Sequence, residues 1–222
     1  MEQRELRKTD DGSVTFYLTE YDEHFHSHHG AYNESMHVFI RNGLDIVQSE
    51  RKSLSILEMG MGTGLNVLLS LIHRNPDTEI HYTALELYPL TQEEYGILDY
   101  SNMPGLAETS ELFHTIHDAP WKKEIEIEPN FFLCKKAISL FDLQVEDEFD
   151  LVYYDAFAPR VQPDLWKADA FEVISRALRP GGLLTTYCVQ GAARRAMSEA
   201  GLRVEKIPGP PGKREMAWAR KE

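Results

Sequence analysis

Cysteines are few in this sequence, long hydrophobic runs are missing, and each absence narrows the class of protein. The 222 residues include two cysteines, Cys134 and Cys188, without metal-site spacing, which indicates reduced thiols and a cytoplasmic location. No apolar run approaches the ~20 residues of a membrane span, and the charged start Met-Glu-Gln-Arg-Glu is unlike a signal peptide. The length suits one domain with a small extension.

The net charge of −13 argues at first against a nucleic-acid partner, but the charge is unevenly distributed. Residues 176–222 contain ten Lys and Arg against four Asp and Glu, so they carry +6 and residues 1–175 carry −19. A local basic surface can hold phosphates on an acidic protein, because salt screens charges beyond ~10 Å. A basic tail that is merely solvated is the alternative, and charge alone does not separate the two.

The most informative segment is 54–64, where an apolar run ends in Glu58 and glycines follow at positions 60, 62 and 64. A helix-like run then begins at Leu65, so the pattern is strand, tight turn and helix, the first unit of a nucleotide-binding α/β domain. The dinucleotide fingerprint would need glycine at position 65. An acid followed by three alternate glycines instead resembles the first motif of S-adenosylmethionine (SAM) methyltransferases.

A second acid supports a ligand at this turn. Residues 79–86 read as a strand that ends in Glu86, which lies 22 residues beyond Gly64. At this distance an acid meets ribose hydroxyls, from which a carboxylate can accept hydrogen bonds. A tight turn without any ligand is the competing interpretation.

Alternating elements predict a doubly wound, mostly parallel α/β sheet with a small N-terminal β-hairpin and helix extension. The hairpin is expected over 4–20. Further strands are expected near 54–59, 79–86, 131–134, 149–155, 183–188, 203–207 and 215–219, and helices near 33–49, 65–74, 89–118 (interrupted at Pro104-Gly105), 164–178 and 191–200. Ligands bind at the carboxyl ends of such strands, where Gly60–Gly64, Glu86 and Asp155 fall.

Asp155 ends the buried-type strand 149–154 and precedes the stiff loop Ala156-Phe157-Ala158-Pro159. Methyl transfer needs a positioned, desolvated nucleophile, and an amine must arrive neutral. A carboxylate can orient an amine and take its proton, so Asp155 is the candidate catalytic residue. A structural acid that caps a loop or helix is the alternative.

Three blocks make the resemblance specific: Gly60 to Asn66, with its Gly-Thr-Gly-Leu-Asn ending; Asp155 to Trp166; and Gly212 to Met216, preceded by Arg194-Arg195. Weaker similarity is present at Glu34 to Phe39. These blocks resemble the methyltransferases of the tRNA wobble-uridine pathway that makes 5-methylaminomethyl-2-thiouridine. The likeness covers residues 13–219.

The resemblance implies a class I SAM-dependent methyltransferase with a Rossmann-like fold, its methyltransferase domain at 51–222 and its extension at 1–50. It would methylate the 5-aminomethyl group of the tRNA wobble uridine, in functional connection with the enzymes that form that group. We expect a stand-alone methyltransferase, because 222 residues leave no room for the FAD-dependent oxidase of the fused enzymes. The implied site residues are Asp155 for catalysis; Glu58, Gly60, Gly62, Gly64, Asn66 and Glu86 for SAM; and Glu34, Phe157, Pro159, Arg194, Arg195, Lys213 and Arg214 for substrate or RNA.

Two features need separate interpretation. The family places an acid near the adenine amino group, where this sequence has Lys135 and Lys136, so backbone groups would replace that contact or the register differs. The loop with His24, His26, His28 and His29 has residues that can bind metals, but no cysteine or spaced acid completes a site. We expect no metal, and a loop that is solvated or faces the substrate.

Two other functions remain open from sequence. A small-molecule amine methyl- or aminopropyltransferase shares the glycine turn and the acid after the fourth strand, but a diamine predicts a second acid close to Asp155, and 156–159 contain none. A non-catalytic SAM-binding subunit is the other alternative, although both motifs are intact. The tRNA isoacceptors and the oligomeric state are not encoded in any motif.

Overall fold

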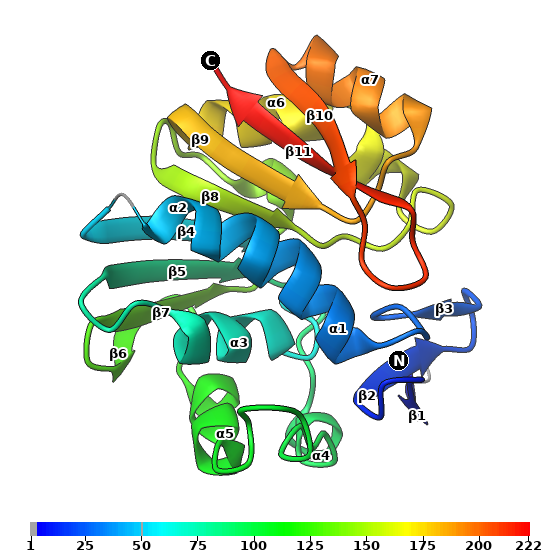
Figure 1. The fold of residues 1–222 in the computed structure, drawn as a ribbon, viewed down its shortest axis with the longest axis vertical. Coiled ribbons are helices and arrows are strands. Elements are labelled where there is room, and N and C mark those ends of the chain that lie inside the picture. Colours follow the sequence, from blue (N-terminus) through cyan, green and yellow to red (C-terminus); the bar gives the residue numbers. More distant parts are fainter. Residues whose placement is uncertain (1–3, 50) are drawn as a thin grey trace.

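A twisted, mostly parallel sheet runs through the molecule, with helices on both faces (Figure 1). The computed structural model describes residues 4–49 and 51–222, and within them the strand order is β10-β11-β9-β8-β4-β5-β7-β6. The strands are β4 (Ser53–Met59), β5 (Glu79–Leu85), β6 (Glu124–Glu128), β7 (Phe131–Lys136), β8 (Phe149–Tyr154), β9 (Leu178–Thr186), β10 (Leu202–Pro208) and β11 (Glu215–Lys221). The central strands β7, β5, β4, β8 and β9 are parallel, whereas β6 and β11 pair antiparallel with their neighbours.

Helices cover the sheet in two groups. The first face carries α1 (Ala31–Ser35), the π-helical η1 (Met36–Leu44), α2 (Asp45–Gln48), α3 (Leu65–His73) and α5 (Ser110–Asp118). The other face carries α6 (Ala168–Ala177) and α7 (Gly191–Glu199). Short helices α4 (Gln92–Tyr95), η2 (Leu140–Asp142) and η3 (Pro163–Trp166) lie in the connections.

The alternation of side chains along each strand builds both cores. Ile56 and Tyr153 belong to the buried cluster with η1 and α3, whereas Leu57 and Tyr154 belong to the cluster with α6 and α7. Successive strand residues point to opposite faces, so a strand buried on both sides reads as a continuous apolar run. Because both faces of β8 are covered, residues 149–154 are all buried and nearly all apolar.

A small antiparallel sheet forms the N-terminal extension, as expected. It contains β1 (Arg4–Lys8), β2 (Val14–Leu18) and β3 (Glu23–His24), with the β1–β2 hairpin inside the expected range 4–20. The chain then enters α1, and η1 packs across β8 and β9. Figure 1 shows the small sheet beside the loop that joins β10 to β11, at the end of the molecule where the central strands finish.

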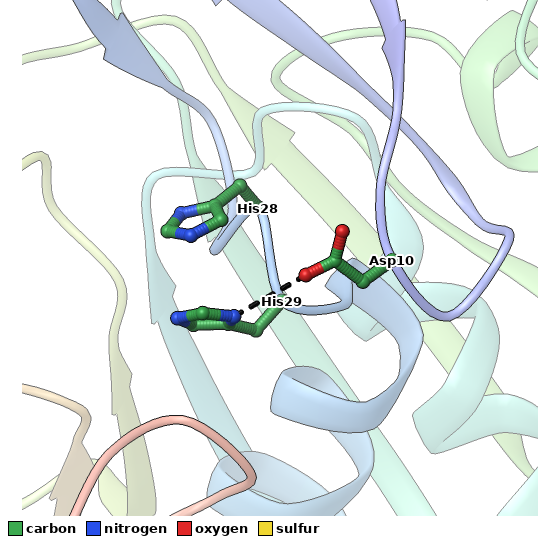
Figure 2. A group of neighbouring side chains, drawn as sticks. All are labelled: Asp10, His28 and His29. Carbon is green, nitrogen blue, oxygen red and sulfur yellow. Dashed lines mark hydrogen bonds and ion pairs between the residues drawn. The ribbon is translucent and has the colours of Figure 1, made fainter.

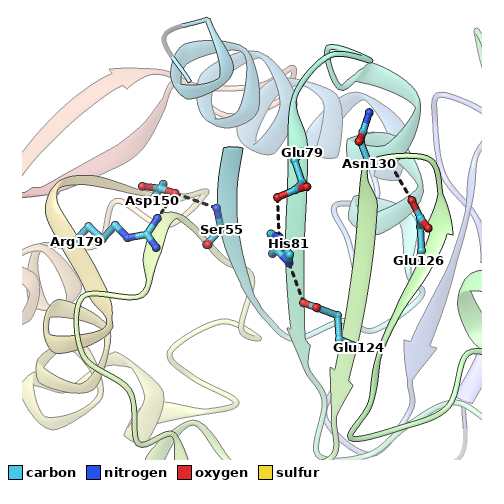
Figure 3. Close-up of polar contacts among 8 residues, drawn as sticks. All are labelled: Ser55, Glu79, His81, Glu124, Glu126, Asn130, Asp150 and Arg179. Carbon is cyan, nitrogen blue, oxygen red and sulfur yellow. Dashed lines mark hydrogen bonds and ion pairs between the residues drawn. The ribbon is translucent and has the colours of Figure 1, made fainter. Parts of the chain in front are cut away.

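Polar contacts fix the opposite end of the sheet (Figure 3). The fully buried carboxylate of Asp150 accepts hydrogen bonds from Arg179 Nη1 (2.6 Å) and Ser55 N (2.9 Å), and also pairs with Arg51. His81 contacts Glu124 (3.0 Å) on one side and Glu79 (3.2 Å) on the other. These contacts connect β9, β8 and β4 in one group and β5 with β6 in another, away from the carboxyl ends of the strands.

Several expectations need correction. The interruption expected at Pro104-Gly105 is confirmed, with Gly105 at φ of +81°, but helix within 89–118 is shorter than expected, because 96–109 form turns and only Gln92–Tyr95 and Ser110–Asp118 are α-helical. Strand β9 begins at Leu178, before the predicted 183, with a register shift opposite Phe149 and Leu151. Strands β3 and β6 were not predicted.

The expected division between 1–50 and 51–222 falls at residue 50, which lies outside the described residues. No described helix has both the length and the apolar character required to cross a membrane.

Candidate active site

A cavity of about 360 Å³ opens at the carboxyl ends of β4, β5 and β8. Its walls include four residues expected from sequence for the cofactor or for catalysis: Gly60, Gly62, Glu86 and Asp155. Ligand cavities in proteins have volumes of about 300–1,000 Å³, so this one suits a nucleoside-sized molecule. Other parts of the chain complete it, namely Arg4 and Leu18 of the small sheet, Phe25, His26, Tyr88, Ile138–Leu140, Phe157 and Val161–Leu165.

The glycine turn leaves the floor of this cavity open. Gly60 has φ of +88°, and a Cβ there would lie 2.8 Å from the carbonyl oxygen of Asp155. Gly62 has φ of +50°, and its Cβ would lie 3.2 Å from the ring of Phe25. Both positions therefore require glycine for conformation and for space. A ligand can approach the backbone here as the sequence pattern predicts, which is the fit expected for SAM.

Glu86 is held in place by the same turn. One carboxylate oxygen accepts the N–H of Gly62 (2.9 Å), and the other accepts the N–H of Tyr88 (2.8 Å). Each oxygen of a carboxylate can accept two hydrogen bonds, so capacity remains for two ligand hydroxyls. This arrangement supports the ribose-binding role expected for Glu86.

Glu58, Gly64 and Asn66 lie deeper than the cavity wall. Glu58 is fully buried on β4, and both its carboxylate oxygens are without a hydrogen-bond partner among the described residues. Burial raises the pKa of Glu58 well above its usual value, and the nearby Asp155 and Glu86 add to the rise, whereas the neighbouring side chains of Asn66 and Tyr82 oppose it. A cationic group near the turn would relieve this carboxylate, which suits the ammonium of an amino-acid moiety.

Asp155 is the acidic group that this cavity shares with a second one beside it. Its Oδ2 accepts a hydrogen bond from Asn66 Nδ2 (3.0 Å). Burial raises the pKa of Asp155 to about 8, and Glu34 adds to the rise, whereas Asn66 and Lys213 oppose it. A carboxyl group that exchanges its proton near neutral pH suits a general base.

A second cavity of about 380 Å³ adjoins the first. The two share the wall residues Phe25, His26, Asp155, Ala156 and Phe157. The rings of Phe25 and Phe157 meet edge to face, with centroids 5.2 Å apart. Asp155 therefore borders both spaces, so it can reach an acceptor amine in one cavity while a methyl donor occupies the other. The remaining wall comes from residues 23–29, Glu34, Arg160, Tyr187, Gly212 and Lys213.

Glu34 and Lys213, both expected at the substrate, meet in this second cavity. The buried Glu34 accepts the N–H of Ser27 (2.8 Å) and forms an ion pair with Lys213 Nζ. The same Nζ lies 4.1 Å from the centroid of the Tyr187 ring. Lys213 therefore points into the cavity, and the C-terminal loop is joined to α1.

The histidines of the His-rich loop differ in exposure and in the cavities that they line. His26 lines both cavities, contacts Thr15 Oγ1 through Nδ1 (3.1 Å), and has its pKa lowered to about 4 by burial, so it is neutral. His28 and His29 are exposed at the rim of the second cavity, and His29 contacts Asp10 at 3.3 Å (Figure 2). The ligand atoms of Asp10, His28 and His29 lie within 4.8 Å of one another. The loop thus faces the expected substrate space, and its freedom from metal stays a prediction.

Lys135 and Lys136, which stand where the family has an acid near the adenine, do not line the cavity. Lys135 is buried; its Nζ donates to the carbonyl of His117 and lies 4.9 Å from the Trp121 ring centroid. Burial lowers the pKa of Lys135 to about 8. Lys136 is the last residue of β7, and its carbonyl accepts the N–H of Glu86. Residues Ile138–Leu140 line the cavity instead.

The other expected RNA residues lie outside both cavities. Arg195 and Arg214 are exposed, and Arg194 is half-buried. Lys206, Arg214 and Arg194 all lower the pKa of Glu215, so these cations surround the first residue of β11. Pro159 lies between the lining residues Ala158 and Arg160 without lining the cavity itself.

Sequence reasoning missed several wall residues. Tyr187 follows β9 at its carboxyl end, and the rule that identified Asp155 also applies to it. Its hydroxyl donates to the Ala156 carbonyl (2.8 Å), which fixes the ring against the Asp155 loop. Arg4 and Phe25 had no comparable signal, because the folding of the N-terminal extension alone brings them to the site.

The fold and the open glycine turn define an α/β transferase of the SAM-binding class. A family model described as S-adenosyl-L-methionine-dependent methyltransferase matches residues 109–222, half of the chain, and the chain belongs to this family. It is therefore a SAM-dependent methyltransferase, as the glycine turn and Glu86 indicated.

Several curated proteins are similar to the chain. The tRNA 5-methylaminomethyl-2-thiouridine biosynthesis bifunctional protein MnmC of Aromatoleum aromaticum is 30% identical over 228 residues, which cover 97% of this chain and 35% of that protein. The protein of the same name from Azoarcus sp. is 29% identical and covers 93% of this chain and 34% of its own length. The chain thus spans about a third of the length of these relatives.

Solved structures agree on the fold. MnmC2 from Aquifex aeolicus has a TM-score of 0.82 at 25% identity, covering 100% of this chain and 71% of that chain. Spermidine synthase from Thermotoga maritima has a TM-score of 0.57 at 14% identity, covering 99% of this chain and 68% of that chain, and shows the shared fold alone.

Proposed function

We propose that the protein transfers the methyl group of SAM to the 5-aminomethyl group of the wobble uridine of tRNA, giving 5-methylaminomethyl-2-thiouridine. The observation that carries the proposal is Asp155, which lines both the cofactor cavity and the adjoining cavity. The names of the MnmC relatives and of the Aquifex structure support this choice of substrate.

The residues divide the work between the two cavities. Gly60 and Gly62 admit the cofactor, and Glu86 holds its ribose. SAM supplies an electrophilic methyl carbon, and transfer to a neutral amine forms the N–C bond as the S–C bond breaks, leaving S-adenosylhomocysteine. Asp155 takes one proton from the substrate ammonium, so that the nitrogen lone pair becomes available. Asn66 holds the carboxylate by its 3.0 Å hydrogen bond, and Phe25 and Phe157 exclude water beside it.

An RNA base can enter the second cavity only if it leaves its stack. Phe157 offers an aromatic face for such a base, as proteins that read single-stranded RNA commonly do. Arg194, Arg195 and Arg214 lie outside both cavities on the C-terminal part of the chain, and we assign them phosphate contacts.

The alternative is an amine transferase for small molecules, favoured by the fold shared with spermidine synthase. The second acid that a diamine requires has a candidate in Glu34, which lines the same cavity as Asp155. The test is to offer the protein SAM with hypomodified tRNA, and separately SAM or decarboxylated SAM with putrescine, followed by mass analysis. The proposal predicts a methylated nucleoside in the tRNA and no alkylated diamine. Alkylated putrescine with unmodified tRNA would overturn it.

A further inference from the structure

The ammonium group of Lys213 occupies an unusual place for a residue of a basic tail. It pairs with Glu34, whose side chain is only 8% exposed, and lies over the Tyr187 ring at 4.1 Å. The loop that carries it connects β10 to β11, and Arg214 next to it is exposed. A lysine that binds an RNA phosphate would hold its ammonium group out toward solvent. The ammonium group of Lys213 instead lies against Glu34 and Tyr187, which indicates a different role.

The surroundings of that ammonium form a cation-binding subsite. Glu34 is fixed by the N–H of Ser27 (2.8 Å), and Tyr187 is fixed by its hydrogen bond to the Ala156 carbonyl (2.8 Å). A fixed carboxylate and an aromatic face are the groups that hold an ammonium ion best. Asp155 lines the same cavity, so a cation bound there is next to the candidate base.

We propose that Glu34 and Tyr187 bind the aminomethyl ammonium group of the substrate, and that Lys213 holds this subsite with its own ammonium until the substrate displaces it. The inference rests on the proposed function, whose substrate is a primary amine. Exchange of one ammonium for another keeps the buried Glu34 paired throughout, which avoids the large penalty of leaving a buried charge alone. The flexible lysine stem allows withdrawal without movement of the sheet.

The subsite also sets specificity. A wobble uridine that still carries a carboxymethyl group on its amine would bring an anion next to Glu34 and Asp155. Like charges in a half-buried cavity repel, so that precursor is rejected and the free primary amine is accepted. The same argument predicts weak binding of uridine without any amine, since Lys213 would then stay at Glu34.

Binding of 5-aminomethyluridine tests the subsite, measured by calorimetry on the protein saturated with S-adenosylhomocysteine. Lys213→Met keeps the stem and removes the competing charge, so affinity should rise about threefold or more. Glu34→Gln removes a charge-assisted contact worth about 1.5–3 kcal/mol, so affinity should fall at least about tenfold. Lys206→Met is the matched control: Lys206 is an exposed lysine of the same region, paired with Glu215 at 2.8 Å outside both cavities, and its loss should leave affinity unchanged.

The outcomes are separable. Weaker binding in Lys213→Met, with an unchanged unfolding midpoint, would make Lys213 a direct substrate contact and overturn the proposal. Equal binding of uridine and 5-aminomethyluridine to all variants would overturn it as well, even if the wild type methylates tRNA, and would leave the proposed function intact. Absence of methyl transfer to tRNA by the wild type would instead refute the proposed function itself.

Discussion

Asp155 carries most of the proposed chemistry at the level of single residues. Its place at the carboxyl end of β8 was predictable, because an acid that directly follows a nearly continuous apolar strand lies at the edge of the sheet where ligands bind. Its pKa was not predictable, since burial and Glu34 raise it and Glu34 is 121 positions away in sequence. The contact of Asp155 with Asn66 likewise depends on where α3 packs.

Asp155→Asn should reduce turnover at least about 100-fold, the contribution expected of a general base. SAM affinity should change much less, because the glycine turn and Glu86 are untouched. Single-turnover methyl transfer and calorimetry measure the two quantities. Asp169→Asn, which changes an exposed acid at the start of α6, is the control and should behave as wild type. Normal turnover in Asp155→Asn would assign the residue a structural role.

The raised pKa of Asp155 also predicts how stability depends on pH. The folded protein keeps the proton up to about pH 8, whereas the unfolded chain releases it near 3.8. The folded state therefore binds more protons between these values, and its free energy of unfolding falls as pH rises through them. The asparagine of Asp155→Asn does not titrate, so the variant does not lose this stability as pH rises. In urea denaturation, the free energy of unfolding of the variant minus that of wild type should therefore be larger at pH 9 than at pH 5. A pH-independent difference would contradict the buried, protonated carboxyl group.

At the level of elements, the β4–α3 turn shows what the sequence could and could not predict. The strand, the glycine turn, the helix and β5 were predicted because local periodicity and the positive φ of glycine determine them. The edge strand β6 was missed although its Glu-Ile-Glu-Ile-Glu alternation is the period-two signal of a strand. The second cavity was beyond prediction, because β3, α1 and the β10–β11 loop meet only in the folded chain.

Two glycines of this turn should respond differently to substitution. Gly62→Val places a side chain into the cofactor cavity against Phe25, and it should abolish SAM binding in calorimetry while the protein stays folded. Gly64→Ala instead places a methyl group 2.8 Å from His117 Nε2, outside the cavity, at φ of +75°. It should lower stability by about 1–3 kcal/mol with SAM binding largely kept. SAM binding by Gly62→Val at wild-type affinity would exclude the assigned cofactor cavity.

The Asp150 cluster gives a prediction at the other end of the sheet. Asp150→Ala removes the acceptor of Ser55 N and separates Arg179 and Arg51 from the strand ends. The free energy of unfolding should fall by about 1–3 kcal/mol, with SAM affinity unchanged. Asp77→Ala, an exposed acid in the α3–β5 connection, is the control in the same denaturation experiment. Equal stability of the two variants would show that the cluster does not fix the strands.

For the whole molecule, the separation of charge along the chain predicts salt-dependent binding of tRNA. Each neutralised phosphate contact releases counterions, so the affinity falls as salt rises. Changing Arg195 and Arg214 together to Ala should weaken binding of all tRNAs alike and reduce the salt slope by about two. The control changes Lys52, exposed just before β4, and Lys123, exposed just before β6 at the opposite edge of the sheet from β10, and should keep the wild-type slope. An unchanged slope in the arginine variant would place the RNA elsewhere, with the His-rich loop 24–29 as the nearest candidate.

The central claim is that a methyl group passes from SAM to the exocyclic amine of the wobble uridine. Its most direct measurement uses SAM labelled in the methyl group, tRNA that carries 5-aminomethyl-2-thiouridine, and mass analysis of the digested nucleosides. We predict one labelled methyl group, located on the aminomethyl nitrogen of that nucleoside, and none in tRNA whose wobble uridine lacks the aminomethyl group. Label on any other nucleoside, or label that appears equally in both tRNAs, would contradict the account.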